Sequence, residues 1–156
     1  MSRLAGAIVS SPDVYLPAPS SAHGNGTNTV TATSWTDLPT TACTIDVENA
    51  HPTDDMVVLV EWGGWLHATA NGVRICPRVS GSVTIAAGIG SSGPIGWGSV
   101  PQTSNSGNPQ QKRGSAVYVL PPGTATFTMQ AYRDSAAGTQ TANYCTLRAI
   151  PLRYQP

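Results

Sequence analysis

Hydrophobic and polar residues alternate along most of the chain after residue 27. In residues 43–48 every second side chain is apolar, and the side chains between them are polar. The stretches 124–133 and 143–150 keep the same period of two. This is the period of a β-strand with one buried face. No window shows the apolar stripe of an amphipathic helix. The pattern therefore predicts an all-β fold.

Turn-forming residues such as Pro39, Asn71-Gly72 and Pro121-Pro122-Gly123 separate these extended stretches. The predicted strands are 27–35, 43–48, 55–62, 64–70, 72–79, 82–87, 115–120, 124–133 and 143–150. Short strands in this number, without helices, are typical of a sandwich or a barrel. We expect a single antiparallel jelly-roll sandwich of about eight strands, because that fold hides its strand edges by wrapping two sheets together.

The stretch 55–62 departs from the alternation because both of its faces are apolar. Val57 and Leu59 lie on the face opposite Met56, Val58 and Val60. A strand that is apolar on both sides is covered on both sides. In a single sandwich the second cover can be another subunit. The candidates for a subunit interface are Val57, Leu59, Trp62 and Trp65.

Residues 1–26 differ in composition from the remaining chain, 27–156, which forms the predicted jelly-roll domain. The segment is rich in Pro, Ser and Gly, and its prolines favour an extended backbone. We expect an N-terminal arm that is too poor in apolar residues to form a core and that docks on a partner. Its docking residues would be Leu4, Ile8, Val9, Val14, Tyr15 and Leu16.

The long segment 88–114 begins with Gly88-Ile89-Gly90-Ser91-Ser92-Gly93, which matches G-x-G-x-x-G. A dinucleotide site needs these glycines to open a helix and needs an acidic residue about 20 positions later. Here Pro94 and further glycines follow the motif, and no acidic residue occurs between Glu61 and Asp134. We therefore expect no dinucleotide cofactor. A loop this long is typical of a variable display surface, with Trp97, Lys112 and Arg113 as contact candidates.

Charge and composition exclude several classes of function. The 156 residues carry no net charge and only 10% are charged, whereas a nucleic-acid-binding protein needs a basic face. The apolar run at residues 4–9 is shorter than a secretory signal requires, and no run is long enough to span a membrane. We expect neither nucleic acid nor membrane as a partner.

No constellation of catalytic or metal-binding residues stands out. His23, His51 and His67 share no ligand spacing. Neither a paired-carboxylate pattern, a G-x-S-x-G elbow nor a P-loop is present. We expect no enzyme activity, no metal and no cofactor. The three cysteines are expected to be buried thiols, with one bridge left open if two strands bring a pair together.

Two segments carry a family resemblance, "SWTDLPTTACTIDV" at 34–47 and "GTQTANYCTLRAIPLRY" at 138–154. They resemble small virion proteins of tailed bacteriophages that are built on a tumour-necrosis-factor-like jelly roll. The resemblance implies a homotrimeric, non-enzymatic structural protein of the virion, made in the cytoplasm of the bacterial host. The leading expectation is a capsid decoration (cement) protein whose N-terminal arm binds the major capsid protein.

Two alternatives remain open at this point. One is a minor tail or baseplate protein that binds another tail protein. The other belongs to a different class, a carbohydrate-binding adhesion module that uses the loop 88–114 to bind a host surface glycan. The adhesion hypothesis requires Trp97 and tyrosine side chains to be exposed, because aromatic rings stack on sugars.

Overall fold

The computed structural model describes residues 15–38, 43–69, 72–87, 108–134 and 136–156. These residues form nine β-strands and no α-helix, as the alternating pattern predicts. The strands are β1 (Ser20–His23), β2 (Thr27–Thr29), β3 (Thr36–Asp37), β4 (Thr44–Asn49), β5 (Asp55–Ala68), β6 (Val73–Gly81), β7 (Gln110–Leu120), β8 (Gly123–Arg133) and β9 (Gln140–Gln155).

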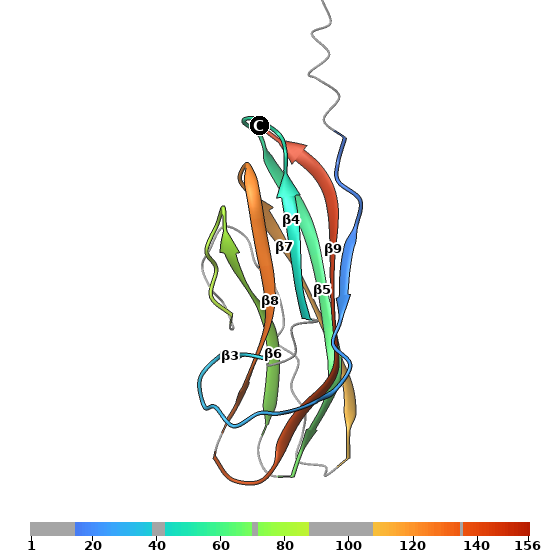
Figure 1. Cartoon of the computed structure of the whole chain (residues 1–156), viewed down its shortest axis with the longest axis vertical. Helices are drawn as coiled ribbons and strands as arrows, with labels where there is room; N and C mark the ends of the chain where they lie inside the picture. The colour runs from blue at the N-terminus through green and yellow to red at the C-terminus, as the bar shows by residue number, and fades with distance from the viewer. Residues whose placement is uncertain (1–14, 39–42, 70–71, 88–107, 135) are drawn as a thin grey trace, which may run out of the picture.

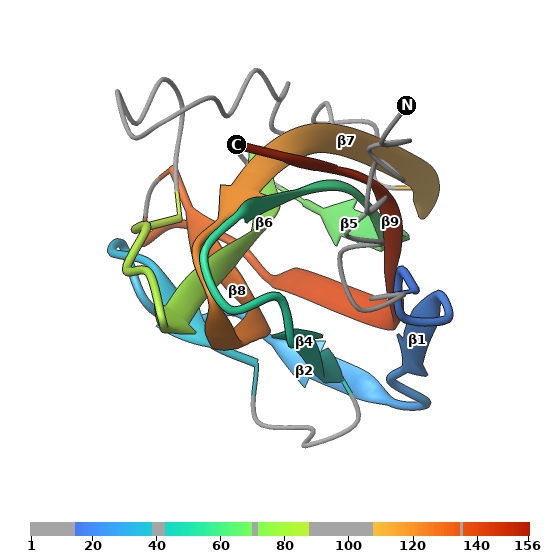
Figure 2. The same cartoon turned by 90° about the horizontal axis from the view of Figure 1, so that it is seen from above.

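The strands build two antiparallel sheets that pack face to face (Figure 1). The first sheet has five strands: β5 lies between β9 and β7, and β1 and β2 both pair with β9. The second sheet has four strands centred on β8, which pairs with β3, β4 and β6. Seen from above, the strands of both sheets curve around a shared interior (Figure 2).

From β4 to β9 the chain alternates between the sheets. β4, β6 and β8 belong to the second sheet, and β5, β7 and β9 belong to the first. Successive strands therefore lie in opposite sheets, as in a jelly roll. The predicted all-β antiparallel jelly roll is confirmed.

The core lies between the sheets and is filled by alternate residues of each strand. The outer positions of β4 are exposed, whereas Ile45 and Val47 are buried. In β8 the inward residues include Phe127 and Met129, both fully buried. The period of two in the sequence therefore marks the buried face correctly.

Several strand boundaries differ from the sequence expectation. The stretches 55–62 and 64–70 form the single strand β5, because the Gly63-Gly64 pair is absorbed by a bulge in the pairing with β9 rather than breaking the strand. The stretch 82–87 is not a strand, and only an isolated bridge joins Ile85 back to Val79.

Two strands also extend into segments that the sequence assigned to the arm and to the long loop. Within the predicted arm, residues 20–23 form β1 and pair with Thr146–Ala149 of β9. Strand β7 begins at Gln110, inside the predicted loop 88–114. Long-range pairing extends these strands beyond what the local apolar pattern indicates, since a polar residue can occupy a strand position whenever a partner strand is available.

Candidate functional site

The most distinctive surface of the described residues is the outer face of the first sheet, which we call the contact face. It is formed by the residues of β1, β9, β5 and β7 that point away from the core. At one end this face is apolar. Leu59 lies opposite both Val117 and Ile150, and all three are half-buried. Nearby, Leu152 is 47% exposed. An apolar sheet face left partly open to solvent is typical of a protein–protein contact.

A polar hollow of about 560 Å³ occupies the middle of the contact face. It follows two adjacent rows of the sheet, in which the paired residues come from four different strands. One row is Ser115, Glu61, Arg148 and Ser21, and the other is Arg113, Gly63, Thr146 and His23.

Gly63, in the second row, packs closely against β7. A Cβ added to Gly63 would lie 2.9 Å from the Lys112 carbonyl oxygen and 3.2 Å from the Arg113 side chain. A larger residue at this position would therefore clash with the backbone of the neighbouring strand. At the rim of the hollow, Arg148 Nη1 lies 3.8 Å from Glu61 Oε2. Both side chains are about half exposed, so this ion pair contributes little to stability.

The contact face ends in two exposed aromatic residues. Trp65 is 43% exposed and Tyr144 is 60% exposed. Trp65 pairs with Asn143, the residue before Tyr144, so the two rings belong to neighbouring positions of β5 and β9. Exposed aromatic residues are enriched at protein interfaces.

The structure places the four predicted interface residues on two different faces of β5. Leu59 and Trp65 lie on the contact face. Val57 shares this face but is only 7% exposed, because its own chain already covers most of it. Trp62 is a correction: it is 3% exposed and belongs to the core cluster, since it alternates with Glu61 and therefore points between the sheets.

Two of the three predicted contact residues of the loop 88–114 lie in a strand, and the third lies outside the described residues. Lys112 and Arg113 lie in strand β7, paired with Gly64 and Gly63, so they are sheet residues rather than loop residues. Arg113 lines the polar hollow. Trp97 lies outside the described residues, and its role in glycan binding stays a prediction.

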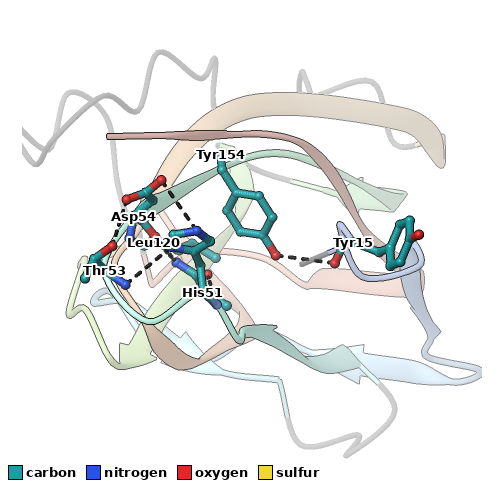
Figure 3. A network of polar contacts seen from close by, with 7 residues as sticks. Tyr15, His51, Thr53, Asp54, Leu120 and Tyr154 are labelled. Carbon is teal, nitrogen blue, oxygen red and sulfur yellow. Dashed lines mark hydrogen bonds and ion pairs between the residues drawn. The ribbon is translucent and has the colours of Figure 1, made fainter. Parts of the chain in front are cut away.

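The described part of the arm begins beside the end of β9. Tyr15 is 81% exposed and Leu16 is 36% exposed. The Tyr154 hydroxyl donates a hydrogen bond of 3.4 Å to the Tyr15 carbonyl oxygen (Figure 3), and the Tyr154 ring lies 5.0 Å from the ring of His51. The other predicted docking residues of the arm, Leu4, Ile8, Val9 and Val14, lie outside the described residues.

His51 organises the connection between β4 and β5. Its Nδ1 accepts hydrogen bonds from the backbone N–H groups of Asp54 at 2.8 Å and Thr53 at 3.3 Å, and its Nε2 lies 3.5 Å from the Asp54 carboxylate (Figure 3). Both ring nitrogens therefore hold the turn in place. This arrangement is a structural one.

A second polar cluster lies on the outer face of the second sheet. Arg78 donates two hydrogen bonds to the Asp37 carboxylate, at 2.9 and 3.0 Å, and Gln130 donates a third at 2.7 Å. The hydrogen bonds from Arg78 lower the pKa of Asp37, whereas burial opposes this shift. The cluster ties β3 to β6 across β8. Asp37 is therefore held ionised.

Within the described ranges, no cluster of three or more His, Cys, Asp or Glu side chains could hold a metal ion. The same ranges contain no helix that is long and apolar enough to cross a membrane.

Sequence reasoning missed part of the contact face. Val117, Ile150 and Arg148 were not singled out, although the sequence carries a signal for the first of them. The stretch 115–120 is apolar on both faces, as 55–62 is. Two such strands, adjacent in the sheet, would have indicated one shared covered face.

Comparison with known proteins bears on the fold alone. No protein-family model matches the chain, and no curated protein sequence matches it. Among solved structures it is similar to the Eiger TNF of S. frugiperda, with a TM-score of 0.50 and 12% sequence identity over 88% of this chain and 94% of that chain. The likeness supports a TNF-like jelly-roll sandwich.

Proposed function

We propose that this chain is a non-enzymatic structural subunit that assembles into a homotrimer through the contact face and fastens to a larger particle through its N-terminal arm. The observation that carries the proposal is the partly exposed apolar and aromatic surface of the first sheet, with Leu59, Val117, Ile150, Trp65 and Tyr144. Folds of the TNF type commonly form homotrimers, and closed symmetry is the usual state of such subunits.

The more specific proposal concerns the particle. The segments 34–47 and 138–154 resemble virion proteins of tailed phages, which favours a capsid decoration protein bound to the major capsid protein. A minor tail or baseplate protein is the alternative location. Cryo-electron microscopy of intact virions would distinguish the two, because the density of the jelly roll would lie on the head in one case and on the tail in the other. Virions that lack the protein altogether would contradict both.

The oligomeric state tests the contact face directly. Light scattering at micromolar concentration should give three times the chain mass of 16.1 kDa. Trp65→Glu should yield monomers, because it replaces an exposed aromatic contact with a charge that becomes buried and unpaired on assembly.

The matched control is Thr44→Glu, which adds the same charge at an exposed position on the outer face of the second sheet. This variant should remain a trimer. A monomeric wild-type protein, or loss of the trimer in the control alone, would contradict the assignment of the interface.

Attachment is tested by removing residues 2–14. The deletion stops before Tyr15 because β1 belongs to the first sheet, and a longer deletion would remove a strand pairing with β9. The truncated protein should stay a folded trimer that no longer adds to particles stripped of this protein. Three arms on one trimer act together and raise the effective concentration of each attachment, so the loss should be large.

A length-matched control separates the arm's apolar residues from its length. Replacing Leu4, Ile8 and Val9 with Ser keeps the arm but removes its apolar groups, and we expect the same loss of binding. If the truncated trimer decorates the particles as tightly as the full chain, the sandwich makes the attachment and the proposal for the arm fails.

A further inference from the structure

Two of the three cysteines meet between the sheets. Cys43 directly precedes β4 in the second sheet, and Cys145 lies in β9 of the first. The Cys43 thiol donates a hydrogen bond of 3.2 Å to the Cys145 carbonyl oxygen, and the two thiol groups also contact each other through a hydrogen bond. Cys76 lies in β6, where its thiol contacts the Pro77 carbonyl oxygen at 3.6 Å.

A strained bulge in β9 brings Cys145 to this position. Gly63 pairs with Thr146 and Trp65 pairs with Asn143, so Tyr144 and Cys145 lie opposite the single residue Gly64. Tyr144 has a φ of 49°, which is uncommon for a bulky residue. The bulge turns Tyr144 outward, at 60% exposure, and Cys145 inward, at 1%. Bulges often redirect side chains in this way.

The space for the Cys145 sulfur comes from Gly64. A Cβ added to Gly64 would lie 3.3 Å from Cys145 Sγ, which is a tight contact. The backbone on the other side is also fixed, because the Gly24 N–H donates a 2.6 Å hydrogen bond to the Cys145 carbonyl. The strained residue and the adjacent glycine together place one sulfur beside the other. Observed strain of this kind is concentrated at functional positions.

The surroundings of the two thiols differ. The hydrogen bond from the Cys145 thiol lowers the pKa of Cys43, burial opposes this shift, and the backbone N–H of Gly24 lowers it further. The pKa of Cys145 is raised by the hydrogen bond with Cys43 and by burial. Cys43 therefore forms a thiolate more readily, and the thiolate is the nucleophile in thiol–disulfide exchange.

We propose that Cys43 and Cys145 form a redox-sensitive dithiol that closes into a disulfide between the two sheets, with Cys76 excluded. The oxidant is a low-molecular-weight disulfide such as oxidised glutathione. The Cys43 thiolate attacks one of its sulfurs, and one glutathione thiolate leaves. Cys145 then loses its proton and attacks Cys43 Sγ, which releases the second glutathione. Two protein thiols are oxidised and one glutathione disulfide is reduced to two thiols.

Access to the pair requires the edge of the second sheet to open. Cys43 is 2% exposed, so oxidant does not reach it in the closed fold. Among the described strands, however, β4 pairs with β8 alone and lies at an edge of its sheet, and edge strands open at lower free energy than central strands. The exchange is therefore slow in the folded protein, and the bridge, once closed, holds β4 to β9.

The bridge would close a long loop, because 102 positions separate the two cysteines. A disulfide stabilises a fold mainly by restricting the unfolded chain, and it does so more for longer loops. We expect the oxidised protein to melt about 10 °C above the reduced protein. This inference is independent of the proposed trimer and of its attachment.

The experiment incubates the folded full-length chain with oxidised glutathione at pH 8, alkylates the remaining thiols and maps tryptic peptides without reduction. Cleavage at Arg74, Arg78 and Arg133 places the three cysteines in different peptides. The expected product links the Cys43 and Cys145 peptides with the loss of two hydrogen atoms. The Cys76 peptide should be alkylated.

Variants provide the controls. Cys76→Ala should still form the bridge and show the rise in melting temperature, whereas Cys145→Ala should melt at the same temperature in both redox states. Comparison of oxidised and reduced wild-type protein needs no variant to fold. A stable glutathione adduct without a cross-link, a cross-link to Cys76, or two free thiols with an unchanged melting temperature would each overturn the proposal.

Discussion

Asn49 offers a sharp test of how the two sheets are joined at one end of the sandwich. It is the last residue of β4 and is 2% exposed. Its side-chain amide donates hydrogen bonds of 2.9 Å to the carbonyl oxygens of Asp54, just before β5, and Leu120, at the end of β7. Its side-chain oxygen accepts a 3.0 Å hydrogen bond from the His51 N–H. One side chain thus ties a strand of the second sheet to two strands of the first.

Asn49→Ala removes all three hydrogen bonds. Leaving a buried carbonyl oxygen without its donor costs about 1–3 kcal/mol. Because Asp54 and Leu120 each lose a donor, we expect the free energy of unfolding to fall by about 2–4 kcal/mol. A surface substitution without such contacts changes the free energy of unfolding by about 0.5 kcal/mol or less.

Asn49→Asp is the more informative variant, since it keeps the size and shape of the side chain. It replaces the donating NH₂ group with a carboxylate oxygen that faces two carbonyl oxygens. At pH 7 it should destabilise more than Asn49→Ala, because a buried charge without a partner adds to the lost hydrogen bonds. The folded state raises the pKa of this carboxyl, so the difference from wild type should shrink as the pH falls towards 4.

The assay is urea unfolding at one fixed protein concentration, with Thr44→Ala as a control at an exposed position of the same strand. Equal stability of the Asp and Asn forms at pH 7 would refute the reasoning, because it would mean that the Asn49 amide does not donate to the two carbonyl groups. A loss below 1 kcal/mol in Asn49→Ala would refute it as well.

Two further predictions concern the core and the outer face of the second sheet. Phe127 is fully buried and packs edge-on against Tyr118 with ring centroids 5.1 Å apart, so Phe127→Ala should lower the free energy of unfolding by about 3–5 kcal/mol in urea titration, and a loss under 1 kcal/mol would place the ring outside the core. Asp37 has a lowered pKa in the folded state because of Arg78, so its stabilisation is present above its unfolded pKa and is lost as the pH falls through the folded value. Thermal melts between pH 5 and pH 2 should therefore show a smaller acid-induced loss in Asp37→Asn than in the wild type, and parallel curves would contradict this assignment.

Strand β5 is where the sequence pattern leaves most undecided. The sequence shows that 55–62 is apolar on both faces, but it does not say which face points into the sandwich. The structure places Met56, Val58, Val60 and Trp62 in the core. Leu59 is left on the contact face. Trp62 is consequently a core residue and does not belong to the interface that the sequence predicts.

The sequence by itself determined the fold class and the buried faces of β4, β8 and β9. These follow from a period of two along one strand, which is a local property of the chain. Side chains such as Ile45 and Phe127 are buried wherever the strand lies, because only one face of it can meet the core.

Only the tertiary structure decided which strands lie side by side and what their pairing brings together. The hollow combines Glu61, Arg113 and Arg148 from three different strands. Cys43 meets Cys145 across 102 positions. Such contacts depend on strand order, register and bulges, which arise from the competition among all strands for partners and core space. A local pattern of apolar and polar residues carries no information about that competition, because many pairings satisfy the same alternation.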